Sequence, residues 1–433
     1  MAKNTDLTLR NQVMYSVYVR NHTEKGDLKS LEADLPRIKN LGTDIIWLLP
    51  IHPIGVSHRK GTLGSPYAIS DYRAINPELG SLEDFESLLA KIHELEMKCI
   101  IDVVYNHTSP DSFLAKNYPQ FFYKTKDGEL ENKIEELTDV RDLDYCNLEL
   151  WSYQIETLKY WAGIGVDGFR CDVASLIPLD FWLKAREEVE TVKPGTIWLA
   201  ETVHLSQIQE IRRMGFKVHS DSEIYQAFDI TYDNSMKCEY LGCADGENGF
   251  KDYIKMLEIQ ERIYPENYVK LRFLENNEQP RSTLLFPDLE LLKNWTAFSF
   301  FQKGIVLICG GQEAFDTNTP SLFEKDPVIW DAMDEDFQEF IRVLAKIKKK
   351  EIFAGGFYIV NQDEKKNVVR CVYTKSGKIL IGIFNLADER GSLKVDISDG
   401  TYLNLLDGLT FKVKNGMVKL DGKPYIFETQ WEV

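Results

Sequence analysis

The sequence lacks long hydrophobic runs. No stretch of its 433 residues approaches the roughly 18 consecutive apolar residues that a membrane-spanning helix needs. The N-terminal segment MAKNTDLTLRNQ also has no apolar run of the kind found in a secretory signal peptide. These absences predict a protein that does not enter a membrane, and they favour a cytoplasmic location.

Positive charge is also scarce, because 51 Lys and Arg residues face 68 Asp and Glu residues, for a net charge of −17. Nucleic acids and anionic membranes bind basic surfaces, so this charge argues against both as partners. The hydrophobic content of 44% and charged content of 27% are near the globular average, so a large core can form.

Cysteines are few and scattered. The seven of them are odd in number and show no CxxC spacing, so neither a disulfide framework nor a zinc site is indicated. Reduced thiols fit a cytoplasmic protein.

The first three quarters of the chain alternate short apolar runs with amphipathic helical patterns. Helices are predicted at 30–42, after a capping-box pattern of Ser81 and Asp84, and around 148–162 and 180–191. Strands are predicted at 13–19, 44–51, 98–104, 166–173, 196–203, 269–275 and 304–311. Such alternation predicts a parallel sheet, and about eight repeats would close a (β/α)8 TIM barrel.

The pattern changes at two places. After Glu351 the segments become short and alternating, with turn residues between them, which predicts an antiparallel β-sandwich. Residues 108–146 are too many for a simple loop after the third strand and predict a small excursion domain. We therefore expect an α/β protein with a barrel at 1–107 and 147–350, an excursion domain at 108–146 and a β-sandwich at 351–433.

The predicted strands end in polar residues. They are Asp102, Asn106 and His107 at the end of the third strand, Arg170 and Asp172 at the fourth, Glu201 at the fifth, and Glu275 to Glu278 at the seventh. The C-terminal ends of parallel strands meet at one mouth of a barrel, where catalytic groups lie. An acid at a strand end is more often a helix cap or an ion-pair partner, but several in order favour a site.

Asp172 and Glu201 would form a carboxylate pair on adjacent strands, and such a pair suits glycoside hydrolysis. One carboxylate attacks the anomeric carbon, while the other, protonated, supplies a proton to the leaving oxygen. Arg170 lies two residues before Asp172, hence on the same side of the strand, and would keep Asp172 ionised.

Four segments resemble the signature regions of the α-amylase family of glycoside hydrolases, in the family's order: DVVYNH (102–107), GFRCD (168–172), WLAE (198–201) and FLENNE (273–278). The resemblance extends to GTLGSPYAISDY (61–72), HSDSEIYQAFD (219–229) and GGQE (310–313), and covers essentially the whole chain. It implies a retaining hydrolase that cleaves α-glucosidic bonds in maltooligosaccharides or related α-glucans through a covalent glycosyl-enzyme intermediate.

Carried over by position, the resemblance implies that Asp172 is the nucleophile and Glu201 the general acid/base. Arg170 would hold the nucleophile, His107 would hydrogen-bond the sugar, and Tyr67 would be the aromatic platform beneath it. No cofactor is implied as required. Asn106 lies where many members bind a structural calcium, but members without calcium carry the same residue, so calcium is not indicated and no metal is assigned.

The seventh-strand motif departs from the family pattern, which has His-Asp where this chain has Asn277 and Glu278. The implied roles are sugar binding for Asn277 and transition-state stabilisation for Glu278, whose carboxylate lies one methylene further out. A catalytically impaired carbohydrate-binding protein and a transglycosylase remain alternatives to the hydrolase. The preference for α-1,4 or α-1,6 bonds, the substrate length and the oligomeric state also remain open.

Overall fold

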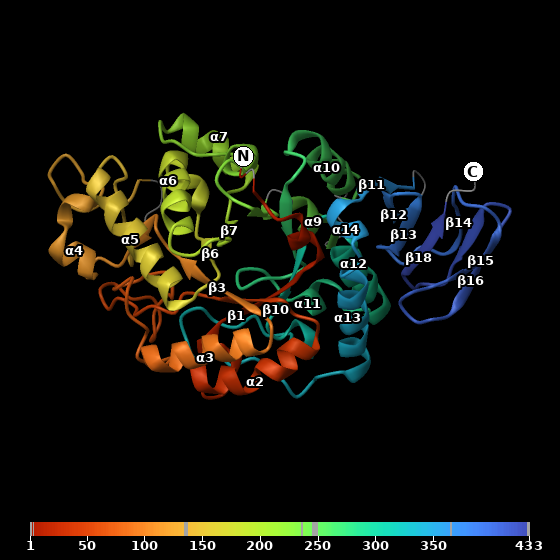
Figure 1. Cartoon of the computed structure of the whole chain (residues 1–433), viewed down its shortest axis with the longest axis horizontal. Helices are drawn as coiled ribbons and strands as arrows, with labels where there is room; N and C mark the ends of the chain where they lie inside the picture. Colours follow the sequence, from red (N-terminus) through yellow and green to blue (C-terminus); the bar gives the residue numbers. More distant parts are fainter. Residues whose placement is uncertain are drawn as a thin grey trace.

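The chain folds into a barrel and a β-sandwich that lie side by side (Figure 1). The computed structural model describes residues 2, 4–133, 137–234, 237–244, 250–363 and 366–430, without the side chains of 237–239 and 244. Eight parallel strands close the barrel in the order β1-β10-β9-β8-β7-β6-β3-β2. The predicted fold class, a TIM barrel followed by an antiparallel sandwich, is confirmed.

The barrel strands are short and buried on both faces, as strands covered by helices are. They are β1 (Val13–Val17), β2 (Ile45–Leu48), β3 (Lys98–Val103), β6 (Gly168–Cys171), β7 (Ile197–Ala200), β8 (Ile230–Tyr232), β9 (Val269–Arg272) and β10 (Ile305–Cys309). Trp47, Leu199 and Leu271 belong to the cluster that fills the barrel interior. A larger cluster lies between the strands and the surrounding helices.

One barrel strand was missed by the sequence interpretation. This sixth strand, β8, has three residues and lies between Asp229 and Asp233, so it carries almost no hydrophobic pattern. It pairs with β7 on one side and β9 on the other, and thereby closes the barrel.

Capping residues mark where several of the longer helices begin and end. The Ser81–Asp84 capping box is present, and Gly42 follows the second helix with a left-handed φ of +91°. The longer helices are α2 (Leu28–Asn40), α3 (Leu82–Glu94), α5 (Leu148–Ile164), α6 (Leu179–Glu190), α7 (Leu205–Arg213), α9 (Lys237–Ala244), α10 (Phe250–Ile263), α12 (Leu289–Phe301) and α13 (Glu335–Lys348). Shorter turns of helix are η1 (Leu7–Asn11), α1 (Val19–His22), η3 (Ala174–Leu176), α8 (Asp221–Ile224), α11 (Ser282–Leu285), η5 (Gln312–Ala314) and α14 (Ile352–Gly355).

The excursion after β3 contains a two-stranded antiparallel sheet, and its helix α4 lies at the far left of Figure 1. Its elements are β4 (His107–Thr108), α4 (Phe113–Asn117), η2 (Pro119–Phe121) and β5 (Arg141–Asp142). His107 pairs with Asp142 in this sheet, so the excursion covers the mouth of the barrel beside β3 and β6.

The C-terminal sandwich has two four-stranded sheets. One has the order β11-β12-β13-β18 and the other β14-β17-β16-β15. Their bounds are β11 (Phe357–Gln362), β12 (Val368–Lys375), β13 (Lys378–Asn385), β14 (Gly391–Lys394), β15 (Gly400–Leu403), β16 (Thr410–Lys414), β17 (Met417–Leu420) and β18 (Tyr425–Gln430).

Helix α12 joins the sandwich to the barrel. Asn294 on this helix accepts a hydrogen bond from Asn385 N at 2.8 Å and donates one to Gly422 O at 2.7 Å. The Phe298 and Phe301 rings lie 5.5 and 5.4 Å from that of Phe384. One helix therefore serves both cores.

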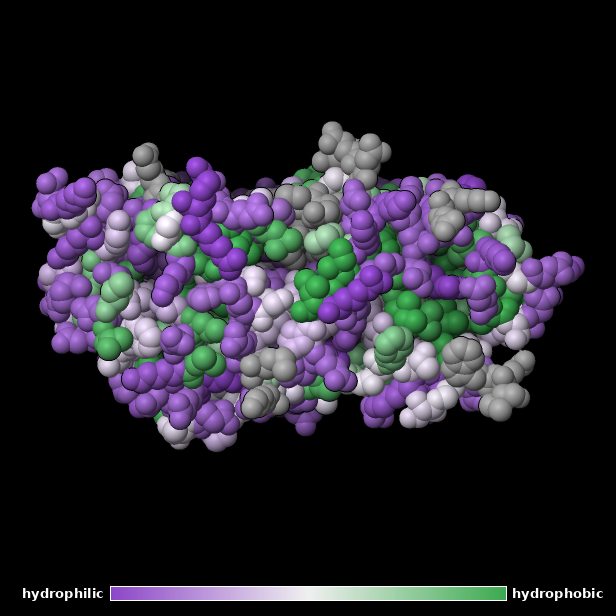
Figure 2. Space-filling view, turned by 90° about the horizontal axis from the view of Figure 1, so that it is seen from above, coloured by the Kyte–Doolittle hydropathy of each residue, from purple (hydrophilic) through white to green (hydrophobic). Residues whose placement is uncertain are grey.

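The surface agrees with the polar composition, since hydrophilic residues cover most of the face in Figure 2, with hydrophobic patches between them. In the part of the chain that the structure describes, no helix is long and apolar enough to cross a membrane. The six cysteine side chains that the structure describes form no disulfide with one another, and the side chain of Cys238 lies outside the described residues.

Candidate active site

Arg170 lies at the centre of a buried cluster of carboxylates at the C-terminal mouth of the barrel. Its Nη1 lies 2.8 Å from Asp102 Oδ1 and 2.8 Å from Asp172 Oδ1, and its Nη2 lies 2.9 Å from Glu201 Oε2. The arginine is 1% exposed and the carboxylate side chains at most 9%. The structure thus brings together three sequence-predicted residues, Arg170, Asp172 and Glu201.

The strand register explains why these groups meet. Asp102 and Arg170 are paired neighbours across β3 and β6, and Cys171 pairs with Ala200 across β6 and β7. Asp172 and Glu201 are therefore the next residues on adjacent strands, at the same level of the barrel. The sequence analysis gave Asp102 no role. Its position near the end of a predicted strand was the only feature that pointed to the site.

Aromatic rings surround the guanidinium. The Arg170 Cζ lies 5.4 Å from the ring centroids of Trp47 and Tyr232, and 5.7 Å from that of Tyr67. Such faces attract a cation and hold it in place. The rings thus help to fix the geometry of the carboxylates that Arg170 binds.

One guanidinium contacts three carboxyl groups in this buried cluster. Burial raises the pKa of Asp172 well above that of a free carboxyl, while Arg170 opposes the rise. Burial also raises the pKa of Asp102 to about 7, again against the effect of Arg170. Near neutral pH such a coupled cluster favours holding at least one proton.

Val173 makes a contact that the sequence did not suggest. Its backbone N–H donates to Glu201 Oε2 at 2.9 Å. The residue has φ +36° and ψ +43°, a left-handed conformation that is strained for a β-branched side chain. Strain of this kind persists where surrounding contacts fix the backbone, and here it aims the N–H at Glu201.

A cavity of about 660 Å³ opens beside Glu201. It is bounded by the excursion domain, by the segment after β6 and by the N-terminal end of α7. Residues lining it include Asn106, His107, Val173, Glu201, Thr202, His204, Gln207, Asn234 and Glu278. Its size is in the range of sites that bind small organic ligands.

His107 lines the large cavity, and the Tyr67 ring lies 5.7 Å from Arg170 Cζ, so both residues are at this mouth. Burial lowers the pKa of the His107 imidazole, so the ring is neutral near pH 7 and can donate one hydrogen bond. The Tyr67 hydroxyl accepts a hydrogen bond from Asn277 Nδ2 at 3.2 Å. Asn277 therefore contacts the proposed sugar platform directly.

The residues of the segment FLENNEQPR (273–281), which follows β9, divide into two groups. Glu275 and Arg281 are buried, with Arg281 Nη1 2.7 Å from Glu275 Oε1, so this pair supports the segment from within. Asn277 and Glu278 face the mouth, and the Glu278 side chain is exposed on the large cavity. Glu278 N donates to Asn276 Oδ1 at 2.9 Å, which turns the backbone between these groups.

The neighbourhood of Asn106 does not fit a calcium ion well. Asn106 Nδ2 lies 3.3 Å from Asp142 Oδ1, and the Lys133 ammonium donates to Leu143 O at 2.5 Å beside the same carboxylate. Calcium prefers six to eight oxygen ligands, and an ammonium group already supplies positive charge here. Among the described residues, which omit 134–136, no three His, Cys, Asp or Glu side chains are grouped to hold a metal.

We therefore expect calcium chelation to change the melting temperature little, because Asp142 already accepts hydrogen bonds from Lys133 N at 2.8 Å and from Asn106 Nδ2 at 3.3 Å. Thermal unfolding with and without EDTA measures this. A drop of many degrees that added calcium reverses would contradict the prediction. Lys133→Met should lower the melting temperature whether or not EDTA is present.

Comparisons with known proteins agree with the fold. A family model described as the α-amylase catalytic domain matches residues 12–133 and 133–351, and a model of the bacterial α-amylase C-terminal domain matches 360–427. A curated relative, α-amylase 2 of Dictyoglomus thermophilum, is 25% identical over 416 residues, which cover 90% of this chain and 69% of that protein.

Two crystal structures are similar over nearly the whole chain. An α-amylase from Lactobacillus plantarum is 44% identical with a TM-score of 0.94, and a noncanonic maltogenic α-amylase from Thermotoga neapolitana is 34% identical with a TM-score of 0.88. Each comparison covers 98% of this chain and 100% of the other. The resemblance recognised in the four sequence motifs is thus confirmed, and this chain is a member of the α-amylase family of glycoside-hydrolysing enzymes.

Proposed function

We propose that this enzyme hydrolyses α-glucosidic bonds in maltooligosaccharides and retains the anomeric configuration. The observation that carries the proposal is the binding of Asp172 and Glu201 to the two terminal nitrogens of one guanidinium. Carboxylates held so close together suit the nucleophile and acid of a retaining enzyme, since an inverting enzyme needs room for water between them.

In the first step Asp172 attacks the anomeric carbon, and the bond to the leaving oxygen breaks as Glu201 transfers its proton to that oxygen. This step uses Glu201 in its protonated form and Asp172 as the carboxylate whose Oδ1 lies 2.8 Å from Arg170 Nη1. In the second step Glu201 takes a proton from water, the water oxygen bonds to the anomeric carbon, and Asp172 leaves.

The other residues at the mouth position the sugar in this proposal. Tyr67 presents a half-buried ring beneath it, and His107 and Asn277 offer hydrogen bonds to its hydroxyl groups. Such hydrogen bonds contribute to rate when they strengthen in the transition state. Glu278 adds a negative charge on the same side, where positive charge develops on the ring.

The test is to follow maltooligosaccharides, isomaltose and pullulan by proton NMR during the first minutes of reaction. We expect the newly formed reducing end to appear as the α-anomer, with no product longer than the substrate. First formation of the β-anomer would refute retention. Products longer than the substrate would show the transglycosylase alternative.

A catalytically impaired sugar-binding protein is the second candidate, and the Asn277–Glu278 pair is the observation that favours it. Both residues differ from the family's His-Asp, and a carboxylate displaced by one methylene shifts its oxygens by about 1 Å. Binding of maltooligosaccharides measured by calorimetry, without product after days, would support this second function.

We expect the double variant Asn277→His with Glu278→Asp to raise kcat on maltooligosaccharides about tenfold, with a smaller change in KM. A correctly placed carboxylate stabilises the transition state more than the ground state, and misplacement by about 1 Å costs up to about a hundredfold. Steady-state kinetics measures this. An unchanged or lower kcat, with folding verified, would show that the site is adapted to the longer acid.

A further inference from the structure

Two loops meet over one side of the barrel mouth, the side opposite the large cavity. Residues 57–66 lie between β2 and α3 and lead into Tyr67, and residues 318–326 lie between β10 and α13. We call these two segments the loop pair. In the sheet order β2 and β10 flank β1, across the barrel from β6 and β7, while Lys60 of the first loop lies 3.0 Å from Asp139 Oδ1 of the excursion domain.

Hydrogen bonds and close packing hold the loop pair together. Leu63 N donates to Phe323 O at 3.1 Å, and Thr62 N donates to Glu324 Oε1 at 2.9 Å. The Thr62 hydroxyl also donates to the second oxygen of Glu324. Gly61 has φ +64°, and a Cβ there would lie 2.7 Å from Phe323 Cβ, so the close approach requires glycine.

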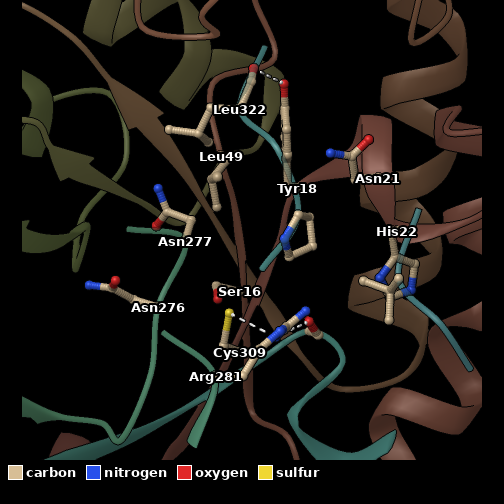
Figure 3. A pocket seen from close by; sticks show the side chains of 13 residues that line it. Ser16, Tyr18, Asn21, His22, Leu49, Asn276, Asn277, Arg281, Cys309 and Leu322 are labelled. Atoms are coloured by element: carbon tan, nitrogen blue, oxygen red, sulfur yellow. Dashed lines mark hydrogen bonds between the residues drawn. The ribbon is translucent and has the colours of Figure 1, made fainter. Parts of the chain in front are cut away.

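The loop pair is also fixed to the barrel from below. Arg20, 1% exposed, donates from Nη1 to Gly64 O at 3.1 Å and to Leu322 O at 3.3 Å, one carbonyl from each loop. Its Nη2 lies 2.9 Å from Glu78 Oε2. Tyr18 adds a hydrogen bond from its hydroxyl to Leu322 O at 3.1 Å, drawn as a dashed line in Figure 3.

Little space remains between the loop pair and the catalytic mouth. The cavity in Figure 3, lined by Tyr18, Leu49, Asn276, Asn277 and Leu322 among others, has a volume of about 30 Å³. That volume holds one or two water molecules and no sugar ring. Asn277 separates it from the catalytic mouth, because its side chain also binds the Tyr67 hydroxyl.

The proposed function determines which part of the substrate lies on each side of the mouth. The sugar that Asp172 attacks lies over Tyr67, and the departing chain lies beyond Glu201, which protonates its oxygen. The cavity of about 660 Å³ beside Glu201 therefore receives the leaving group. The side beyond Tyr67, where the non-reducing part of the substrate would continue, is the side that the loop pair closes.

Resting on that proposed function, we propose that the loop pair restricts cleavage to the non-reducing ends of α-glucan chains and excludes internal bonds. A chain end fits between Tyr67 and the loop pair, while the rest of the chain extends into the large cavity. Thr62 and Glu324 determine this specificity by holding the two loops together.

The test compares two forms of maltoheptaose with the unmodified enzyme, both labelled at the reducing end with a fluorescent amine. One is otherwise unmodified, and the other carries a 4,6-O-ethylidene group on its non-reducing glucose. We expect the first to shorten stepwise, with glucose as the small product, and the second to remain intact. Cleavage of both at similar rates would overturn the proposal, and cleavage of neither would refute the hydrolase function on which it rests.

A variant tests the loop pair itself. Glu324→Ala removes the hydrogen bonds from Thr62. Loss of a hydrogen bond to a charged group shifts the equilibrium between the closed and the separated loop pair by about tenfold or more. We expect this variant to cleave the blocked substrate at least about tenfold above the background left by the parent, with internal products. Asp331→Ala, an exposed acid in the same connection, is the matched control and should leave the blocked substrate intact. If both variants behave like the parent, the loop pair does not set the specificity.

Discussion

Replacing Asp172 with asparagine is expected to abolish turnover while leaving the protein folded. The amide cannot attack the anomeric carbon, and loss of a covalent nucleophile costs on the order of 10⁴-fold or more in kcat. The amide oxygen can still accept the hydrogen bond from Arg170 Nη1 that Asp172 accepts at 2.8 Å. Initial rates on maltooligosaccharides and a melting curve measure the two effects.

The melting temperature should stay equal or rise, because the variant relieves the crowding of three buried carboxyl groups around one guanidinium. Asp180→Asn, at an exposed position in the first turn of α6, is the matched control and should keep parental activity. Near-parental turnover by Asp172→Asn would show that the nucleophile has been assigned wrongly. Labelling with an activated fluorinated glucosyl donor should likewise mark the parent and not this variant.

Glu201→Gln is expected to lose activity according to the leaving group. General acid catalysis contributes about 10²–10⁴-fold when the leaving oxygen needs a proton, as it does in maltooligosaccharides. A 4-nitrophenyl glycoside leaves without protonation, so its first step should be slowed far less. The ratio of the two kcat/KM losses, measured on one preparation, therefore identifies the acid.

A small nucleophile provides the second half of this test. Azide needs no deprotonation, so it should restore turnover of the 4-nitrophenyl substrate by the Glu201→Gln variant and yield a glycosyl azide of α configuration. Glu187→Gln, exposed on α6, is the control and should show neither loss nor rescue. Equal losses on both substrates, without rescue, would contradict the acid/base role.

The fold was predictable where hydrophobic period and local signals agree. Buried runs such as Ile45–Leu48 and the capping box at Ser81 mark elements that the structure confirms. Strand β8 was missed because its three residues carry too little pattern. Its strand conformation follows from its pairing with β7 and β9. In the sandwich, β15 and β16 are mostly exposed, so their apolar alternation is too weak to detect.

The candidate site was predictable in part for the same reason. The period of two along a strand correctly predicts that Arg170 and Asp172 meet. The contact of Glu201 with Arg170 depends on the register between β6 and β7, which no single segment encodes. Sequence also could not show that Glu275 turns inward to Arg281, because five residues of loop separate them and the direction of each side chain follows from packing.

The role of α12 in two cores limits how this protein can be recombined. Truncation after residue 350 would leave the Asn294 amide and the Phe298 and Phe301 rings without their partners on β13. Likewise, a sandwich taken from a distant relative would meet a helix whose outer face was shaped for another surface. An exchange of modules must therefore carry α12 along with the strands it contacts.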